Sequence, residues 1–432
     1  MPDESILSDD FVRQLSAVGE VDLLVGIPTL NNRGTVQHVL GAVKAGLAAH
    51  FPRERSVVVI PDGGSRDGTV DAVKEASRAE FKNPFPYSSF RTSHIICTRY
   101  HSLLGQGGAL RMILAAADLL HAGACALIAP DLESITPEWI SALLRPVRKD
   151  SFDFVLPIYQ RHRLDGLLIK NVLSPLIQTA YGYRVEEPVG GVFGFSSNLA
   201  CRYLEQDVWH EDLIRFAADL GMVTTAMAGG FRLCQSYLGP KTRRSKQAGR
   251  DLSGAIQQVV GALFRSLEIH QAYWTGRGAP NDAPVFGVVT SGELEPAHAN
   301  PKPMMRMFRS GVDELTSILQ KILVPATLES LREITKLGDQ EFRFPDELWA
   351  KTVFEFASAY HHPSINRDHI LQALTPLYRG RIGAFLRENE GAGSDTVAEK
   401  LEALHRQFED LRPYLVERWS AEERGELWDT SS

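Results

Sequence analysis

The sequence predicts an α/β fold with a mostly parallel sheet, followed by a mostly helical C-terminal region. From residue 21 onward, short apolar runs alternate with stretches whose apolar residues recur at helical spacing. This alternation is typical of β-α-β units and of a sheet covered on both faces. From about residue 250 the apolar stripes follow the helical period without strand signals. A chain of 432 residues also exceeds what one hydrophobic core normally serves, so we expect more than one unit.

The elements follow one another in a regular order. The predicted strands are 21–29, 56–61, 93–99 and 124–130, and the predicted helices among them include 67–79, which Asp67 is placed to cap, and 107–122. We therefore predict an N-terminal extension over 1–20, an α/β domain over 21–250 and a helical domain over 251–432. In such sheets a ligand binds beyond the carboxyl ends of the strands. Functional residues are expected just after each strand, at 29–32, 62–69, 105–108 and 131–133.

Composition and charge exclude several classes of protein. The net charge of −7 provides no general attraction to nucleic acid. The four cysteines, Cys97, Cys125, Cys201 and Cys234, are widely spaced, which favours reduced core thiols over disulfides or a metal site. The acidic N-terminus lacks the pattern of a signal peptide, and no apolar run approaches the roughly 18–20 residues of a membrane span. We expect a cytoplasmic protein.

The turn after the second predicted strand, DGGSRDGT (62–69), is suited to a nucleotide. Its glycines let the backbone approach a ligand closely, and Asp62 at the strand end can accept hydrogen bonds from a base or ribose. Alone, this segment is also typical of a turn with a helix cap. Its position after the second strand of a β-α-β series, with PTLNN after the first strand, makes the functional interpretation more specific.

The segments GIPTLNN, PDGGSRDGTVDAV, GQGGALRMIL and LIAPDLES resemble the first half of the A-type nucleotide-sugar glycosyltransferase fold, as in glycosyltransferase family 2. Later segments, PDLESITPEWI, EEPVGGVFGFSSNLACRYL, WHEDLIRFAADLGM and GRDLSGAIQQVV, are similar to the family of mannosylglycerate synthase and glucosyl-3-phosphoglycerate synthase. The resemblance covers nearly the whole chain. It implies a hexosyltransferase that moves glucose or mannose from a nucleotide diphosphate sugar to a small anionic acceptor such as glycerate or phosphoglycerate, with retention of configuration.

The resemblance also assigns residues. The set implied for donor binding is Pro28, Thr29, Asn31, Asp62, Gly107, Asp131, Gly190 and Gly191. Asp212 matches an acid near the reacting sugar in the family. The family places acceptor contacts in 159–171, where a carboxylate on the acceptor calls for a bidentate arginine. The expected acceptor residues are Arg161, Arg163 and Asp165.

Two departures from the family bear on the leaving diphosphate, whose negative charge must be neutralised. Ala129 stands where the first acid of the family's Asp-x-Asp motif would be, and 239–253 contains no histidine to serve as a metal ligand. Asp131 and Glu133 remain as ligands for a divalent cation, Mg²⁺ or Mn²⁺. The other solution is a clamp of basic groups, Arg243, Arg244 and Lys246. The sequence leaves both solutions open.

Other functions also remain open. A sugar-nucleotide-binding protein without catalysis would account for Ala129 and the missing histidine. A nucleotidyltransferase also uses acids at strand ends, but PTLNNRGT is a poor match to its phosphate-binding loop. The sequence does not distinguish uridine from guanosine donors or glucose from mannose. It does not identify the acceptor, and the resemblance together with the apolar helical stripes suggests a homodimer.

Overall fold

The structure is a computed structural model that describes residues 7–78, 94–99, 106–206, 212–243, 252–278, 280–281, 283–288 and 300–423. The chain forms two compact units. The first contains 1–160, 185–248 and 282–292, and the second contains 161–184, 249–281 and 293–432. This division differs from the predicted single boundary at residue 250, because 161–184 join the helical unit and 282–292 join the sheet.

The first unit is built on an eight-stranded sheet with the order β3-β2-β1-β4-β6-β5-β7-β8. The strands are β1 (Leu23–Gly26), β2 (Ser56–Asp62), β3 (His94–Arg99), β4 (Ala124–Ile128), β5 (Phe154–Gln160), β6 (Val192–Ser196), β7 (Leu233–Pro240) and β8 (Val285–Phe286). Strand β6 runs antiparallel between β4 and β5, and the other pairings are parallel. The predicted mostly parallel sheet is confirmed.

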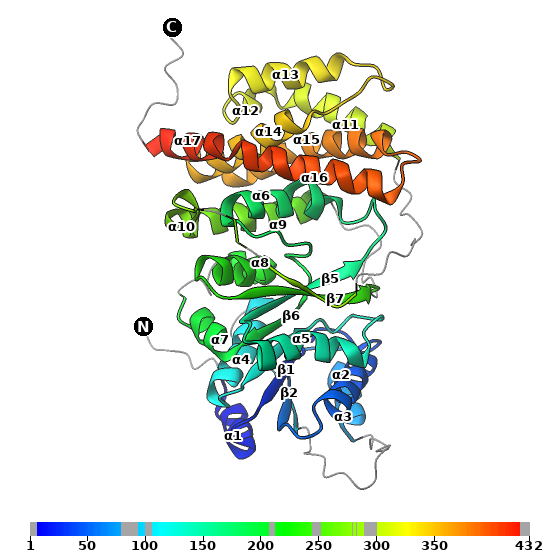
Figure 1. The fold of residues 1–432 in the computed structure, drawn as a ribbon, viewed down its shortest axis with the longest axis vertical. Coiled ribbons are helices and arrows are strands. Elements are labelled where there is room, and N and C mark those ends of the chain that lie inside the picture. Colours follow the sequence, from blue (N-terminus) through cyan, green and yellow to red (C-terminus); the bar gives the residue numbers. More distant parts are fainter. Residues whose placement is uncertain are drawn as a thin grey trace. The chain divides into compact units, whose positions relative to one another are not determined.

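Helices cover both faces of this sheet (Figure 1). One group consists of α2 (Val36–His50), α3 (Thr69–Arg78) and α5 (Pro137–Asp150), and the other of α1 (Asp9–Val18), α4 (Gln106–Leu119), α7 (Ser197–Leu204) and α8 (Asp212–Ala228). In β1, Leu23 and Val25 pack into the core that α2 and α5 line. A Cβ atom on Gly26 would lie 2.6 Å from Ile113 of α4, so alternate residues of β1 face opposite helical layers.

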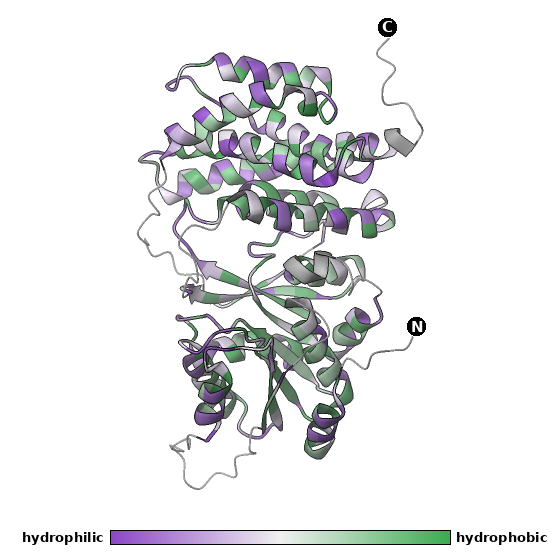
Figure 2. Ribbon diagram, turned by 180° about the vertical axis from the view of Figure 1, so that it is seen from behind, coloured by the Kyte–Doolittle hydropathy of each residue, from purple (hydrophilic) through white to green (hydrophobic). Residues whose placement is uncertain are grey.

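Burial on both faces explains why the strands were recognisable in the sequence. Every residue of β1, β2 and β4 is buried, which requires continuous apolar runs in place of alternation. Figure 2 shows these strands mainly in green, the hydrophobic end of its scale, with purple concentrated on the surrounding helices and loops. Within the predicted extension 1–20, helix α1 buries Phe11, Leu15 and Val18.

The second unit is helical, as predicted for the C-terminal region. Its elements are η1 (Ile169–Leu173), α6 (Ser174–Tyr181), α9 (Leu252–Ile269), α10 (Gln271–Thr275), α11 (Pro301–Glu314), α12 (Thr316–Leu319), α13 (Pro325–Lys336), α14 (Asp346–His361), α15 (Arg367–Glu388), α16 (Ser394–Asp410) and α17 (Arg412–Glu423). Segment 161–184 belongs here because η1 and α6 pack against α9, α10 and α16. Among the helices in the described ranges, none is long and apolar enough to cross a membrane.

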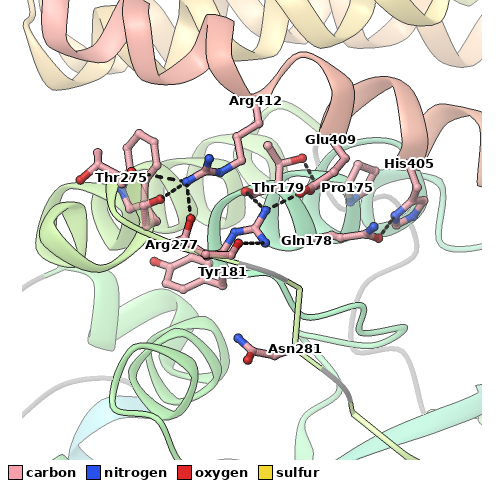
Figure 3. A network of polar contacts seen from close by, with 12 residues as sticks. Pro175, Gln178, Thr179, Tyr181, Thr275, Arg277, Asn281, His405, Glu409 and Arg412 are labelled. Atoms are coloured by element: carbon pink, nitrogen blue, oxygen red, sulfur yellow. Dashed lines mark hydrogen bonds and ion pairs between the residues drawn. The ribbon is translucent and has the colours of Figure 1, made fainter.

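Two arginines, Arg277 and Arg412, hold the ends of helices in this unit (Figure 3). The Arg277 guanidinium, with 3% of its side chain exposed, donates to the Thr179 carbonyl at 3.1 Å and pairs with Glu409. Arg412 donates to the carbonyls of Trp274 and Arg277. Carbonyls at the carboxyl end of a helix lack hydrogen-bond donors within the helix. These guanidinium groups supply donors to the last carbonyls of α6 and α10.

Candidate functional site

Three polar turns lie at one edge of the sheet because they follow neighbouring parallel strands. Thr29 follows β1, Asp62 ends β2 and Asp131 follows β4. The first and third turns are joined directly, since the Thr35 hydroxyl donates to the Pro130 carbonyl at 2.7 Å. The sequence predicts these residues at the carboxyl ends of parallel strands, and the structure brings them together there.

The Asp62 carboxylate is fully buried within its own turn. One oxygen accepts from the hydroxyls of Thr29 (3.1 Å) and Ser65 (2.5 Å), and the other accepts from the amides of Gly64 (3.0 Å) and Ser65 (2.9 Å). A carboxylate offers about four acceptor sites, so these donors occupy the group. Asp62 therefore fixes the shape of the turn, and its predicted contact with a nucleoside stays a prediction.

The turns after β1 and β2 are interlocked by further hydrogen bonds. The Asn31 amide donates to the Ser65 hydroxyl at 2.8 Å, and the Asn31 side-chain oxygen accepts from the Arg66 amide at 3.0 Å. The Arg33 amide donates to Asp67 at 3.0 Å. Asn31 adopts a φ of 53°, a conformation that asparagine tolerates better than most residues. The two turns form one rigid surface.

Beside this surface, three donors converge on the carbonyl oxygen of Gly190. They are the Lys241 ammonium at 2.6 Å, the Tyr159 hydroxyl at 3.2 Å and Nη2 of Arg243 at 3.3 Å. The Lys241 ammonium also lies 4.1 Å from the centre of the Tyr159 ring, within cation–π range. The glycine pair and the basic segment after β7, which were separate predictions, therefore meet.

Arg243 also connects this cluster to the turn after β4. Its Nε lies 3.7 Å from the Asp131 carboxylate, and its backbone forms a bridge with Leu132. The Glu133 amide donates to the Thr242 carbonyl at 3.0 Å, so the two segments run side by side. The side chains of Asp131 and Arg243 are 27% and 36% exposed, which leaves both accessible to a ligand.

The sequence analysis did not identify Asp219, which joins the same cluster from α8. Its carboxylate accepts from the Gly191 amide at 2.8 Å. Burial raises the pKa of this carboxyl, although the Gly191 hydrogen bond and the Arg243 and Lys241 charges act in the opposite direction. The only signal in the sequence was its position seven residues after Asp212, since this spacing places two residues on one helix face.

The described residues do not assemble a cage for a divalent cation. No group of three or more histidine, cysteine, aspartate or glutamate side chains with suitable placement occurs among them. Asp131 instead lies next to the Arg243 guanidinium, whose positive charge disfavours a second cation at the same carboxylate. A cation at Asp131 and Glu133 would need substrate phosphates and water as its remaining ligands.

The other predicted donor and catalytic residues are only partly described. Pro28 follows β1 at the same edge, and Gly107 is buried in the first turn of α4. Asp212 begins α8, but its side chain lies outside the described residues, as do Arg244 and Lys246. Of the predicted basic clamp, Arg243 is described.

The predicted acceptor residues Arg161, Arg163 and Asp165 belong to the helical unit. They form a short loop in which the Asp165 amide donates to the His162 carbonyl at 2.9 Å. The Lys170 ammonium donates to the Arg163 carbonyl at 3.0 Å, which ties the loop to η1. Their role toward an acceptor stays a prediction.

Comparison with solved structures finds glucosyl-3-phosphoglycerate synthase from Mycobacterium tuberculosis, the enzyme that the sequence motifs resemble. The structure with Mn²⁺, uridine diphosphate and glucosyl-3-phosphoglycerate is 17% identical, with a TM-score of 0.42 over 62% of this chain and 85% of that chain. The structure with Mg²⁺ and uridine diphosphate is 18% identical, with a TM-score of 0.41 over 59% and 83%.

A mycobacterial protein is 20% identical, with a TM-score of 0.40 over 60% of this chain and 78% of the other. No protein-family model matches the chain, and no curated protein matches it significantly. The identities and TM-scores are too low to carry substrate or activity from these structures to this chain.

Proposed function

We propose that the protein transfers a hexosyl group, glucose or mannose, from a nucleotide diphosphate sugar to a small anionic acceptor such as glycerate or phosphoglycerate, with retention. The observation that carries this proposal is the cluster of Lys241, Arg243, Asp131 and the 190–191 peptide beside the interlocked turns. It supplies fixed positive charge at the sheet edge where α/β proteins bind ligands. The motif resemblance supplies the choice of nucleotide sugar.

Lys241 and Arg243 are suited to a leaving diphosphate. When the bond between the anomeric carbon and the phosphate oxygen breaks, the phosphate keeps the electron pair and negative charge develops on it. Arg243 presents a planar guanidinium that can bind phosphate oxygens in a bidentate manner, and Lys241 supplies a compact second charge. Both groups are already held in place by Gly190, so little reorganisation is needed when the charge develops.

The interlocked turns after β1 and β2 are suited to the nucleoside. Their backbone is fixed because amide groups donate to the Asp62 and Asp67 carboxylates and to the Ser65 hydroxyl, so binding costs little ordering of the chain. Asp212 is proposed to orient the acceptor or the reacting sugar. Arg161, Arg163 and Asp165 are proposed to contact the acceptor. In a retaining reaction by internal return, the acceptor hydroxyl attacks the anomeric carbon on the face from which the diphosphate leaves and gives its proton to an oxygen of the leaving phosphate.

The test is release of nucleoside diphosphate from UDP- and GDP-sugars, with D-glycerate and 3-phosphoglycerate as acceptors, first in EDTA and then with Mg²⁺ or Mn²⁺. We expect acceptor-dependent release that persists in EDTA, because fixed basic groups neutralise the diphosphate. Release abolished by EDTA would assign that role to a cation at Asp131 and Glu133. Nucleotide binding without release under any condition would favour a binding protein without catalysis.

Substitution of the clamp makes the same test specific to this chain. Arg243→Met should lower kcat by about 100-fold, the loss seen when one preorganised charge donor is removed from an active site. Arg202→Met is the matched control. Arg202 is an exposed arginine of the same unit, and its ion-pair partner is the exposed Glu205. Equal activity of the two variants would contradict the role of Arg243.

A further inference from the structure

Asp219 is an acid of the cluster that the proposed reaction does not use. It lies on α8, and its carboxylate reaches the amide of Gly191 at 2.8 Å. The leaving diphosphate is an anion, so a carboxylate next to Lys241 and Arg243 opposes its binding by simple charge. Because the Asp219 carboxylate repels the diphosphate, it must contribute to the site in another way.

The contribution is visible in the peptide group between Gly190 and Gly191. Its carbonyl oxygen accepts from Lys241, Arg243 and Tyr159, and its N–H donates to Asp219. The C=O and N–H of a trans peptide point in opposite directions. One peptide group is therefore held from both sides, with cations at its oxygen and an anion at its nitrogen.

Glycine makes this peptide easy to rotate unless something holds it. Two adjacent glycines have the widest choice of backbone conformation, and Gly191 adopts a φ of 70°. A flipped peptide would turn its carbonyl toward the Asp219 carboxylate and its N–H toward Lys241 and Arg243. Both contacts would be repulsive, so the charges on the two sides select one orientation.

We propose that Asp219 is a positioning residue that locks the 190–191 peptide, so that the Gly190 carbonyl holds Lys241 and Arg243 ready for the diphosphate. This inference rests on the proposed function for the identity of the anion. The lock itself is a property of the free protein. An experiment can therefore test it separately from the proposed function.

The experiment compares Asp219→Ala with Asp219→Asn in the full chain. Asparagine keeps an oxygen that can accept from the Gly191 amide but has no charge, whereas alanine keeps neither. Amide hydrogen exchange of residues 186–196 reports the lock, and calorimetry with inorganic pyrophosphate reports the anion site. Asp71→Ala, at an exposed position on α3, is the control for loss of a carboxylate elsewhere in this unit.

Asp219→Ala should speed exchange in 186–196 by about tenfold or more while exchange in β1 and β2 stays unchanged, and should weaken pyrophosphate binding by about tenfold. Asp219→Asn should give exchange rates between those of Asp219→Ala and the unsubstituted protein, because its oxygen accepts from the Gly191 amide without the charge, and it should bind pyrophosphate more tightly than Asp219→Ala. Unchanged exchange in Asp219→Ala, or identical behaviour of the two variants, would overturn the lock. Absence of pyrophosphate binding to the unsubstituted protein, with the exchange results as expected, would instead overturn the proposed function.

Discussion

Gly191 lies so close to Arg243 that a Cβ atom on the glycine would stand 2.1 Å from Nη2 of the arginine. Non-bonded heavy atoms do not approach to this distance, so any side chain at 191 must displace the guanidinium. The φ of 70° at Gly191 also favours glycine for reasons of the backbone alone. The two effects can be separated, because Gly230 has the same φ with open space around it.

Gly191→Ala should therefore weaken pyrophosphate binding by about tenfold, since Arg243 is displaced, whereas Gly230→Ala should leave it unchanged. Both variants should lose about 1–2 kcal/mol of unfolding free energy, the usual cost of a left-handed conformation in a residue with a Cβ atom. Calorimetry and urea unfolding measure the two quantities. Equal binding by the two variants would mean that the guanidinium adjusts without consequence.

Asp62→Asn tests whether this acid shapes the turn, as its four hydrogen bonds indicate. The amide nitrogen of asparagine would face donors, so at least one of the contacts with Thr29, Ser65 or Gly64 is lost. We expect a loss of about 2 kcal/mol in unfolding free energy, together with weaker nucleotide binding. Asp71→Asn on the exposed face of α3 is the control. Weaker binding without a change in stability would point to a direct nucleoside contact.

Glu355 should make the stability of the protein depend on pH in the helical unit. Its fully buried carboxylate accepts from the Thr327 and Tyr414 hydroxyls at 2.6 and 2.7 Å and from the Val324 amide at 2.9 Å. Burial raises the pKa of this carboxyl above its usual value of 4.5, in spite of these hydrogen bonds. The folded protein thus binds this proton more tightly than the unfolded chain does.

The contribution of Glu355 to the unfolding free energy is therefore greatest below about pH 4.5 and declines as the pH rises through the folded pKa. The advantage of the unsubstituted protein over Glu355→Gln should therefore shrink as the pH rises from acidic to neutral. Urea unfolding across this range measures it. A difference between the two proteins that stays constant with pH would contradict the assignment.

Arg277→Met should destabilise the helical unit more than loss of a surface ion pair does. The arginine is almost completely buried, and its removal leaves the Thr179 carbonyl and Glu409 without this donor (Figure 3). We expect a loss of about 3 kcal/mol in unfolding free energy. Arg184→Met, whose partner Glu402 and own side chain are both more than two-fifths exposed, should cost under about 1 kcal/mol. Similar losses would show that the buried pair is replaceable.

The edge of the sheet that carries the site could be predicted from sequence because buried parallel strands leave continuous apolar runs. Thr29, Asp62 and Asp131 follow such runs directly. The antiparallel direction of β6 left no comparable signal, because a short apolar strand reads the same in both directions. The sequence analysis missed Asp219 because it lies within an apolar helix. The only indication was that Asp219 follows Asp212 by seven residues, a spacing that puts both on the same helix face.

The sequence also did not predict that 161–184 belong to the helical unit. The apolar stripe of η1 and α6 does not say which core it serves, and the chain returns to the sheet at 185. Contacts such as the Trp349 indole to the Asn171 carbonyl at 2.7 Å join residues that are far apart in the chain. Local periodicity carries no information about such pairings.

The interleaving of the two units has a consequence for synthesis. As the chain leaves the ribosome from its N-terminus, strand β7 can join the sheet only after 161–184 has emerged, and β8 only after 249–281 has emerged. Those segments expose apolar helix faces whose partners, among them α14, α15 and α16, are made later. A fragment that ends near residue 250 would therefore lack β8 of the sheet and would carry α6 without the helices that cover it. We expect that neither unit can be produced alone by simple truncation.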